Sequence, residues 1–193
     1  MTDTNNKAFA VEEKTLSSEM LYEGKILNLR RDKVTVRDGR ASYREIVEHN
    51  GGVVMLGLTG DGRIPMIRQY RKAAGQVMLE LPAGKLEKGE DPAEAALREF
   101  KEETGYTAES VRNVAEFYTT VGYSEEILHV FFAEDLEEGS TDFDDSESIE
   151  TTLYQPEELY RLIDEGELND GKTLIALLLF RCHTTSQGGC QVK

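Results

Sequence analysis

The stretch GKLEKGEDPAEAALREFKEETGY, residues 84–106, concentrates acidic side chains in one short segment. Four of these acids fall in a part of it that the pattern predicts to be a single helix: Glu94, Glu99, Glu102 and Glu103. Like charges three or four residues apart on a helix repel each other and lower its stability. Helix formation therefore does not explain why this segment carries so many acidic residues.

The ends of this helix are marked by residue types that favour helix termini. Asp91 is a suitable N-cap, Pro92 suits the first helical position, and Gly105 is a natural C-terminal stop. At about 100° per residue, the charged side of the helix collects Arg98, Glu99, Glu102 and Glu103. The opposite side carries the residues that would anchor it to a core: Ala93, Ala96, Leu97 and Phe100. The spacing predicts three carboxylates presented together, away from the core.

Two readings of this acidic face remain open on spacing alone. A solvated surface helix often has an acidic face, but such a face usually carries lysine four residues from its acids. Glu99 and Glu103 are four apart without such a lysine. A cluster of carboxylates also suits a hard divalent cation such as Mg²⁺, which prefers oxygen ligands.

The whole stretch resembles the Nudix box, written G-x5-E-x7-R-E-U-x-E-E-x-G-U, where U is a bulky apolar residue. All of its fixed positions are matched, by Gly84, Glu90, Arg98, Glu99, Glu102, Glu103 and Gly105. The U positions hold Phe100 and Tyr106, which are aromatic where aliphatic residues are commoner. The resemblance implies a hydrolase that cleaves a diphosphate linked to another moiety, using a divalent metal ion and water.

The resemblance also implies roles for the residues of the box. Glu99, Glu102 and Glu103 would hold the metal, which would be Mg²⁺ with Mn²⁺ as a possible substitute. Glu90 would support the preceding loop, and Arg98 would orient a glutamate of the box. The implied fold is of the mixed α+β class, a Nudix α/β/α sandwich with a small N-terminal antiparallel sheet.

Further stretches resemble one subfamily, the ADP-ribose pyrophosphatases. They are RQYR (68–71), ELPAGKLEKGEDP (80–92), FYTTVGYSEEILHVFFAEDL (117–136) and DDSESIE (144–150). The likeness covers roughly residues 18–181 and implies hydrolysis of ADP-ribose to AMP and ribose 5-phosphate. It also implies a homodimer in which the small N-terminal sheet is exchanged between subunits and helps to bind substrate.

The subfamily resemblance implies functional residues outside the box. The implied substrate contacts are Arg68, Arg71, Glu80 and Glu126, and the carbonyl of Ala83 is an implied metal ligand. In similar enzymes an acid of the loop 142–150 acts as general base or binds a metal; Glu147 matches best and Asp145 second. With Arg98 and Glu102, these two acids form the expected catalytic set. The plainer alternatives are surface charge on a strand for the arginines and a solvated loop for the acids.

The order of elements along the chain supports two parts. Residues 1–48 read as a polar tail, which extends to about residue 16, followed by a small antiparallel sheet with a turn at 37–39; residues 49–193 read as the Nudix domain. A sheet of two or three strands is marginal alone, so the first part is expected to pack on something. In the second part strands interleave with few helices, including 155–168 and 171–183, which favours a mixed fold.

Composition excludes several classes of function. The formal net charge of −15 argues against general affinity for nucleic acid, which needs a basic footprint. The apolar runs are far shorter than a membrane span, and the N-terminus lacks the pattern of a secretory signal. The chain has two cysteines without zinc-type spacing. We expect a cytoplasmic enzyme that binds neither nucleic acid nor membrane.

One departure from the subfamily pattern leaves the substrate open. ADP-ribose pyrophosphatases usually carry proline about 15 residues after the box, where this chain has Val121. Proline would stiffen the loop that shapes the pocket. Another nucleoside diphosphate sugar, such as GDP-mannose, is the near alternative, and a non-catalytic nucleotide-sugar-binding regulatory module the distant one. Tyr22 is a candidate for stacking on the nucleobase, although ordinary packing is the commoner role of a strand tyrosine.

Overall fold

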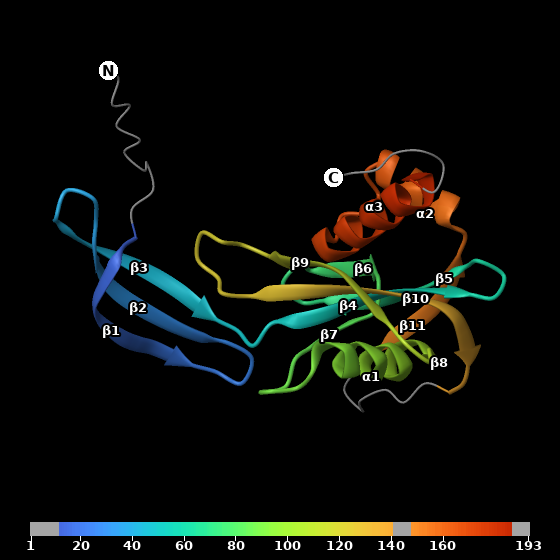
Figure 1. Cartoon of the computed structure of the whole chain (residues 1–193), viewed down its shortest axis with the longest axis horizontal. Helices are drawn as coiled ribbons and strands as arrows, with labels where there is room; N and C mark the ends of the chain where they lie inside the picture. The colour runs from blue at the N-terminus through green and yellow to red at the C-terminus, as the bar shows by residue number, and fades with distance from the viewer. Residues whose placement is uncertain (1–11, 141–147, 187–193) are drawn as a thin grey trace, which may run out of the picture. The chain divides into compact units, whose positions relative to one another are not determined.

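A computed structural model of the chain describes residues 12–140 and 148–186, with side chains described as far as residue 184 (Figure 1). The candidate bases Asp145 and Glu147 lie outside these residues. The chain divides into two compact units. The first combines the N-terminal part up to His49 with Tyr118–Glu126, and the second combines Asn50–Phe117 with the part that begins at Ile127. The predicted domain boundary between residues 48 and 49 stays a prediction.

The first unit is built on an antiparallel sheet in the order β1-β2-β3. Its strands are β1 (Lys14–Glu23), β2 (Asn28–Thr35) and β3 (Ala41–Glu48). The turn predicted at 37–39 is confirmed, because the N–H of Val36 donates to the carbonyl of Arg40 and Gly39 has a φ of 82°. Strand β1 begins inside the stretch expected to be a polar tail. All its residues are exposed, including the apolar Leu16, Met20 and Tyr22, so burial marks neither face of this strand.

The segment Tyr118–Glu126 is joined to the first unit by backbone bonds. The N–H of Val47 donates to the carbonyl of Tyr123 over 2.7 Å, and the N–H of Glu125 donates to the carbonyl of Val47 over 3.0 Å. Arg30 adds a charged contact, since its Nη2 lies 3.1 Å from Oε1 of Glu125.

The second unit contains two further sheets. One has the order β7-β4-β10-β8, with β9 also pairing β10; the other has the order β11-β5-β6. The strands of the first are β4 (Gly52–Thr59), β7 (Ala83–Lys85), β8 (Tyr106–Thr107), β9 (Arg112–Tyr118) and β10 (Ile127–Glu138). Those of the second are β5 (Ile64–Arg71), β6 (Gln76–Glu80) and β11 (Ile149–Tyr154). Strands β4 and β10 are parallel, with Val54 opposite Val130.

Both faces of the central strand β4 are buried, so helices are needed on both sides. Val53 and Met55 pack in one cluster with Phe100 of α1 (Pro92–Thr104), whereas Val54 packs in the other with Leu177 of α3 (Gly171–Ser186). Figure 1 shows α1 on one side of the sheets and α2 (Pro156–Asp164) and α3 on the other. The predicted mixed α+β class is confirmed. In the part of the chain that the structure describes, none of the helices is long and apolar enough to cross a membrane.

Candidate active site

Helix α1 is fixed at both ends and along one side. Asp91 accepts hydrogen bonds from the N–H groups of Ala93 and Glu94, over 2.9 and 3.3 Å. Gly105 ends the helix in the left-handed conformation, with a φ of 77° that only glycine adopts readily. Phe100 is 1% exposed and anchors the helix to the core. The side chains of the acidic face therefore project from a rigid element.

Arg98 holds three of the acids in place. Its Nε lies 3.0 Å from Oε1 of Glu90, and its Nη1 lies 2.9 Å from Oε1 of Glu99 and 3.2 Å from Oε2 of Glu102. Glu90 also accepts a hydrogen bond from the backbone N–H of Glu87. The hydrogen bond to Glu90 raises the pKa of Arg98, and the same contact lowers the pKa of Glu90. One guanidinium thus holds all three carboxylates in place.

Gly84 leaves room for the side chain of Glu99. A Cβ atom at residue 84 would overlap the carboxyl group of Glu99, so any other residue would displace that acid. Here the requirement for glycine comes from close approach, since this glycine does not have a positive φ. The first glycine of the box therefore leaves the space that the carboxyl group of Glu99 occupies.

Glu103 differs from the expected arrangement. Spacing predicts that it is presented beside Glu99 and Glu102, but it is 4% exposed and lies on the buried side of the helix. Its Oε2 accepts a hydrogen bond of 2.9 Å from the N–H of Ala83, which offsets part of the cost of burying the charge. Sequence spacing could not reveal this bond because it joins residues 20 apart.

The donor set at this place fits a hard divalent cation. Glu99 and Glu102 offer carboxylate oxygens from the acidic face of α1, Glu103 offers them from its buried side, and Ala83 offers a carbonyl from strand β7. Within residues 12–140 and 148–186, no three acidic, histidine or cysteine side chains are already gathered as a metal-binding group. Arg98 and the amide of Ala83 occupy carboxylate oxygens of these acids. The metal-ligand roles stay predictions.

Glu80 and Arg71 are paired with each other. Nε and Nη2 of Arg71 each lie 2.7 Å from one oxygen of Glu80, and the Glu80 side chain is 1% exposed. Nζ of Lys172 also contacts Glu80 and lies 2.9 Å from Asp170. Two cations therefore bind one buried carboxylate. The predicted substrate contacts of Glu80 and Arg71 stay predictions, and the structure gives both residues a second role in this network.

Lys172 is a residue that sequence reasoning missed. It is 92 residues from Glu80, so no local pattern links the two. One signal was present: lysine in the first turn of a helix is disfavoured by the helix dipole, which suggests an acidic partner elsewhere.

The other two predicted substrate contacts lie in different units. Arg68, on β5, donates from Nη2 to the hydroxyl of Tyr154 over 3.0 Å, and this contact is exposed. Glu126 belongs to the first unit, where it accepts a hydrogen bond of 2.7 Å from the hydroxyl of Thr119 and lies 3.4 Å from Nδ1 of His49. Their substrate roles are untested predictions.

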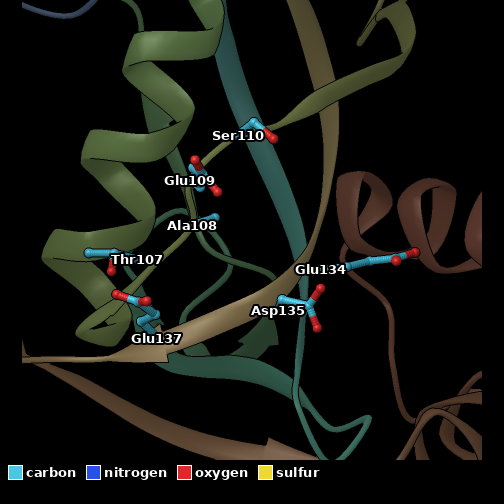
Figure 2. Close-up of a pocket in the computed structure, with 7 residues that line it drawn as sticks. All are labelled: Thr107, Ala108, Glu109, Ser110, Glu134, Asp135 and Glu137. Carbon is cyan, nitrogen blue, oxygen red and sulfur yellow. The ribbon is translucent and has the colours of Figure 1, made fainter.

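A pocket in the second unit is lined by none of the residues of the box, although its lining begins at the residue that follows Tyr106. Figure 2 shows its lining: Thr107, Ala108, Glu109, Ser110, Glu134, Asp135 and Glu137. Asp135 has a φ of 55°, at a bulge in the pairing of β10 with β4. The lining carries four carboxylates and no cation, so it would repel a diphosphate. None of the predicted site residues lines it.

Family models match almost the whole described chain. Residues 48–177 match the model described as NUDIX domain. Residues 13–47 match the model described as nucleoside diphosphate sugar hydrolase N-terminal domain.

Three curated relatives are similar over most of their lengths. The ADP-ribose pyrophosphatase of Bacillus subtilis (strain 168) is 42% identical, over 87% of this chain and 92% of the relative. The methanol dehydrogenase activator of Bacillus methanolicus is 39% identical, over 86% and 91%. The ADP-ribose pyrophosphatase of Mycobacterium tuberculosis is 36% identical, over 89% and 84%.

Two further likenesses are weaker in sequence. A GDP-mannose pyrophosphatase of Yersinia enterocolitica is 31% identical, over 72% of this chain and 78% of the relative. A crystal structure of an ADP compounds hydrolase superposes with a TM-score of 0.81, covering 93% of this chain and 98% of that chain, at 21% identity. At that identity the structure bears on the fold alone, and it agrees with the predicted sandwich.

The buried pair of Glu80 and Arg71 predicts acid-sensitive stability. Burial raises the pKa of Glu80, but the hydrogen bond from Arg71 and the charge of Lys172 outweigh it, so the pKa is lowered overall. A carboxyl of this kind stabilises the fold above its unfolded-state pKa, and this contribution is lost as the pH falls through the folded-state value. In urea denaturation, Glu80→Gln should be less stable than wild type at neutral pH, and the difference should shrink below about pH 4. For the exposed Glu94→Gln the difference should stay near zero; a pH-independent deficit in Glu80→Gln would contradict the assignment.

Proposed function

The chain belongs to the Nudix family, and from this premise we propose that it is a Mg²⁺-dependent pyrophosphohydrolase that converts ADP-ribose to AMP and ribose 5-phosphate in the cytoplasm. The choice of ADP-ribose as substrate rests on the similarity to the ADP-ribose pyrophosphatase of Bacillus subtilis, which extends over nearly the whole of both chains. GDP-mannose pyrophosphatases match less of this chain at lower identity.

The acids of α1 and their partners would hold the cofactor. Glu99, Glu102 and Glu103 supply carboxylates, Ala83 supplies a carbonyl, and Mn²⁺ is a possible substitute for Mg²⁺. When bound, Mg²⁺ supplies positive charge that neutralises phosphate oxygens and acidifies water. Arg98 keeps the acids in defined rotamers before the cation arrives, so little ordering is left for the binding step.

The remaining residues would bind the diphosphate and move a proton. Arg68 is exposed and offers a planar guanidinium suited to phosphate oxygens. A carboxylate at Glu147, or at Asp145, would accept a proton from the attacking water as its oxygen bonds to phosphorus and the bridging P–O bond breaks. Attack at either phosphorus yields the same two products.

A substrate panel tests this proposal. Purified protein with Mg²⁺ is incubated with ADP-ribose, GDP-mannose and other nucleoside diphosphate sugars, and release of nucleoside monophosphate is followed. We expect kcat/KM to be highest for ADP-ribose, with AMP and ribose 5-phosphate formed in equal amounts.

The other outcomes select the alternatives. Turnover of GDP-mannose well above that of ADP-ribose would show that the proposed substrate is wrong and that the proposed hydrolysis of a diphosphate is right. No turnover of any member would leave a non-catalytic regulatory module, which is the reading closest to the name of the Bacillus methanolicus relative.

Glu103→Gln tests the buried acid of the box. The glutamine oxygen can still accept the hydrogen bond from Ala83, so we expect the free energy of unfolding to change by less than about 1 kcal/mol. Loss of the charge should reduce kcat by about 100-fold or more, since removal of even an outer partner of a metal site costs 10–100-fold. Glu94→Gln, an exposed position of the same helix, is the matched control for urea denaturation and activity. An active or an unfolded Glu103→Gln variant would contradict the metal-ligand role.

We also propose that the chain forms a homodimer through exchange of the N-terminal sheet. The sheet of the first unit carries large apolar side chains that are more than half exposed, including Leu16, Tyr22 and Tyr43. Such a surface favours a protein partner, and a second copy supplies one. Light scattering at micromolar concentration should give twice the chain mass of 21.7 kDa; a monomer would reject the exchanged sheet.

A further inference from the structure

The segment 81–84 leads from the end of β6 into β7 and so crosses from one sheet of the second unit to the other, and helices from both sides hold it. The N–H of Leu81 donates to Oγ1 of Thr173 over 2.9 Å, on the α3 side. The carbonyl of Pro82 accepts from the N–H of Met55 over 3.0 Å, and the N–H of Ala83 donates to Glu103 over 2.9 Å. Gly84 follows, and its lack of a side chain leaves room for the carboxyl group of Glu99. The segment therefore links α3 to the acids of α1.

Thr173 is oriented for this contact by an acid at the start of α3. Its side chain is completely buried, and its hydroxyl donates to Oδ2 of Asp170 over 2.6 Å. The same Asp170 oxygen accepts the N–H of Thr173 over 3.1 Å. With the hydroxyl proton directed at Asp170, the oxygen lone pairs of Thr173 are left to accept the N–H of Leu81.

The charged groups beside this contact fasten the same helix end to β6. Lys172 lies between Asp170 and Glu80, and Glu80 is also bound by Arg71. The two acids and two bases neutralise one another, and the Glu80 carboxylate at their centre is almost completely shielded from water, whereas Arg71 is partly exposed. The start of α3 is thus attached to the residue that immediately precedes the crossing segment.

We propose that Thr173 is a positioning residue for the cation site of the box, acting through Leu81 on the segment that carries Ala83 and Gly84. The inference rests on the proposed function of the box acids. Without the hydroxyl, the buried N–H of Leu81 loses its acceptor, and a buried donor without a partner favours displacement of its backbone. Ala83 is two residues away, so the displacement alters both the carbonyl offered to the cation and the amide that fixes Glu103.

The test compares Thr173→Val, which is nearly isosteric and cannot accept a hydrogen bond, with Thr173→Ser, which keeps the hydroxyl. Thr184→Val is the matched control: it removes a hydroxyl from the last turns of the same helix, where that group donates to the carbonyls of Phe180 and Arg181 and interacts with Tyr160, rather than with the segment 81–84. Mn²⁺ binding without substrate is measured by electron paramagnetic resonance, and the Mg²⁺ dependence of activity is measured in parallel.

We expect Thr173→Val to raise the Kd for Mn²⁺ by about tenfold, at the lower end of the effects of outer-shell residues on metal affinity. The Mg²⁺ concentration for half-maximal activity should rise similarly, while kcat at saturating Mg²⁺ stays within about threefold. Thr173→Ser and Thr184→Val should bind Mn²⁺ with wild-type affinity. Wild-type affinity in a folded Thr173→Val variant would overturn the inference, and so would an equal loss in Thr184→Val.

A second measurement uses the wild-type chain and so does not depend on folding of the variant. Because coupling between two places is reciprocal, a diamagnetic divalent cation such as Mg²⁺ should slow hydrogen exchange of the Leu81 amide by several-fold. Unchanged exchange at Leu81, in protein that binds the cation, would overturn the role of Thr173 and leave the proposed function standing. Wild-type protein that binds no divalent cation and cleaves no nucleotide sugar would instead reject the proposed function.

Discussion

The contact of Arg98 with three carboxylates is the interaction on which the acidic helix depends. Glu90, Glu99 and Glu102 would repel one another if each were left alone, and one guanidinium is placed to bind all three. Its planar shape allows this, because its donors point in different directions within one plane. A lysine at residue 98 would supply the charge without the geometry. The acids are consequently held close together and ordered, at a net negative charge that a divalent cation would reduce further.

The crossing between the two sheets brings the rest of the site to this helix. A chain that leaves one sheet to join another must find partners for its backbone groups, because they no longer belong to a ladder. Here the partners are a side chain of α3, the backbone of β4 and a side chain of α1. The absence of a side chain at Gly84 then lets Glu99 reach the segment. The segment 81–84 thus finds hydrogen-bond partners for its own backbone and at the same time positions Glu99 and Glu103.

Local spacing predicted the parts of this arrangement that are local. Asp91, Pro92 and Gly105 are near neighbours of the helix that they delimit, and its observed bounds of Pro92–Thr104 follow from them. The mixed α+β fold class could be predicted because the sequence matches every fixed position of the Nudix box, and the box implies the fold. The burial of Glu103, by contrast, depends on the amide of Ala83, and the network of Lys172 and Thr173 depends on contacts across 92 residues. The spacing of apolar and polar residues along the chain does not encode such contacts.

The loop around Val121 illustrates how a departure in sequence can matter less than it suggests. Proline at this place would restrict the backbone, and its absence argues for a freer loop. In the structure the turn is closed by its own backbone: the N–H groups of Tyr123 and Ser124 both donate to the carbonyl of Thr120, over 3.2 and 2.9 Å. The side chain of Val121 itself is 79% exposed. The turn is therefore restrained by hydrogen bonds that do not depend on the residue type at 121, and the missing ring alone gives little reason to move the substrate away from ADP-ribose.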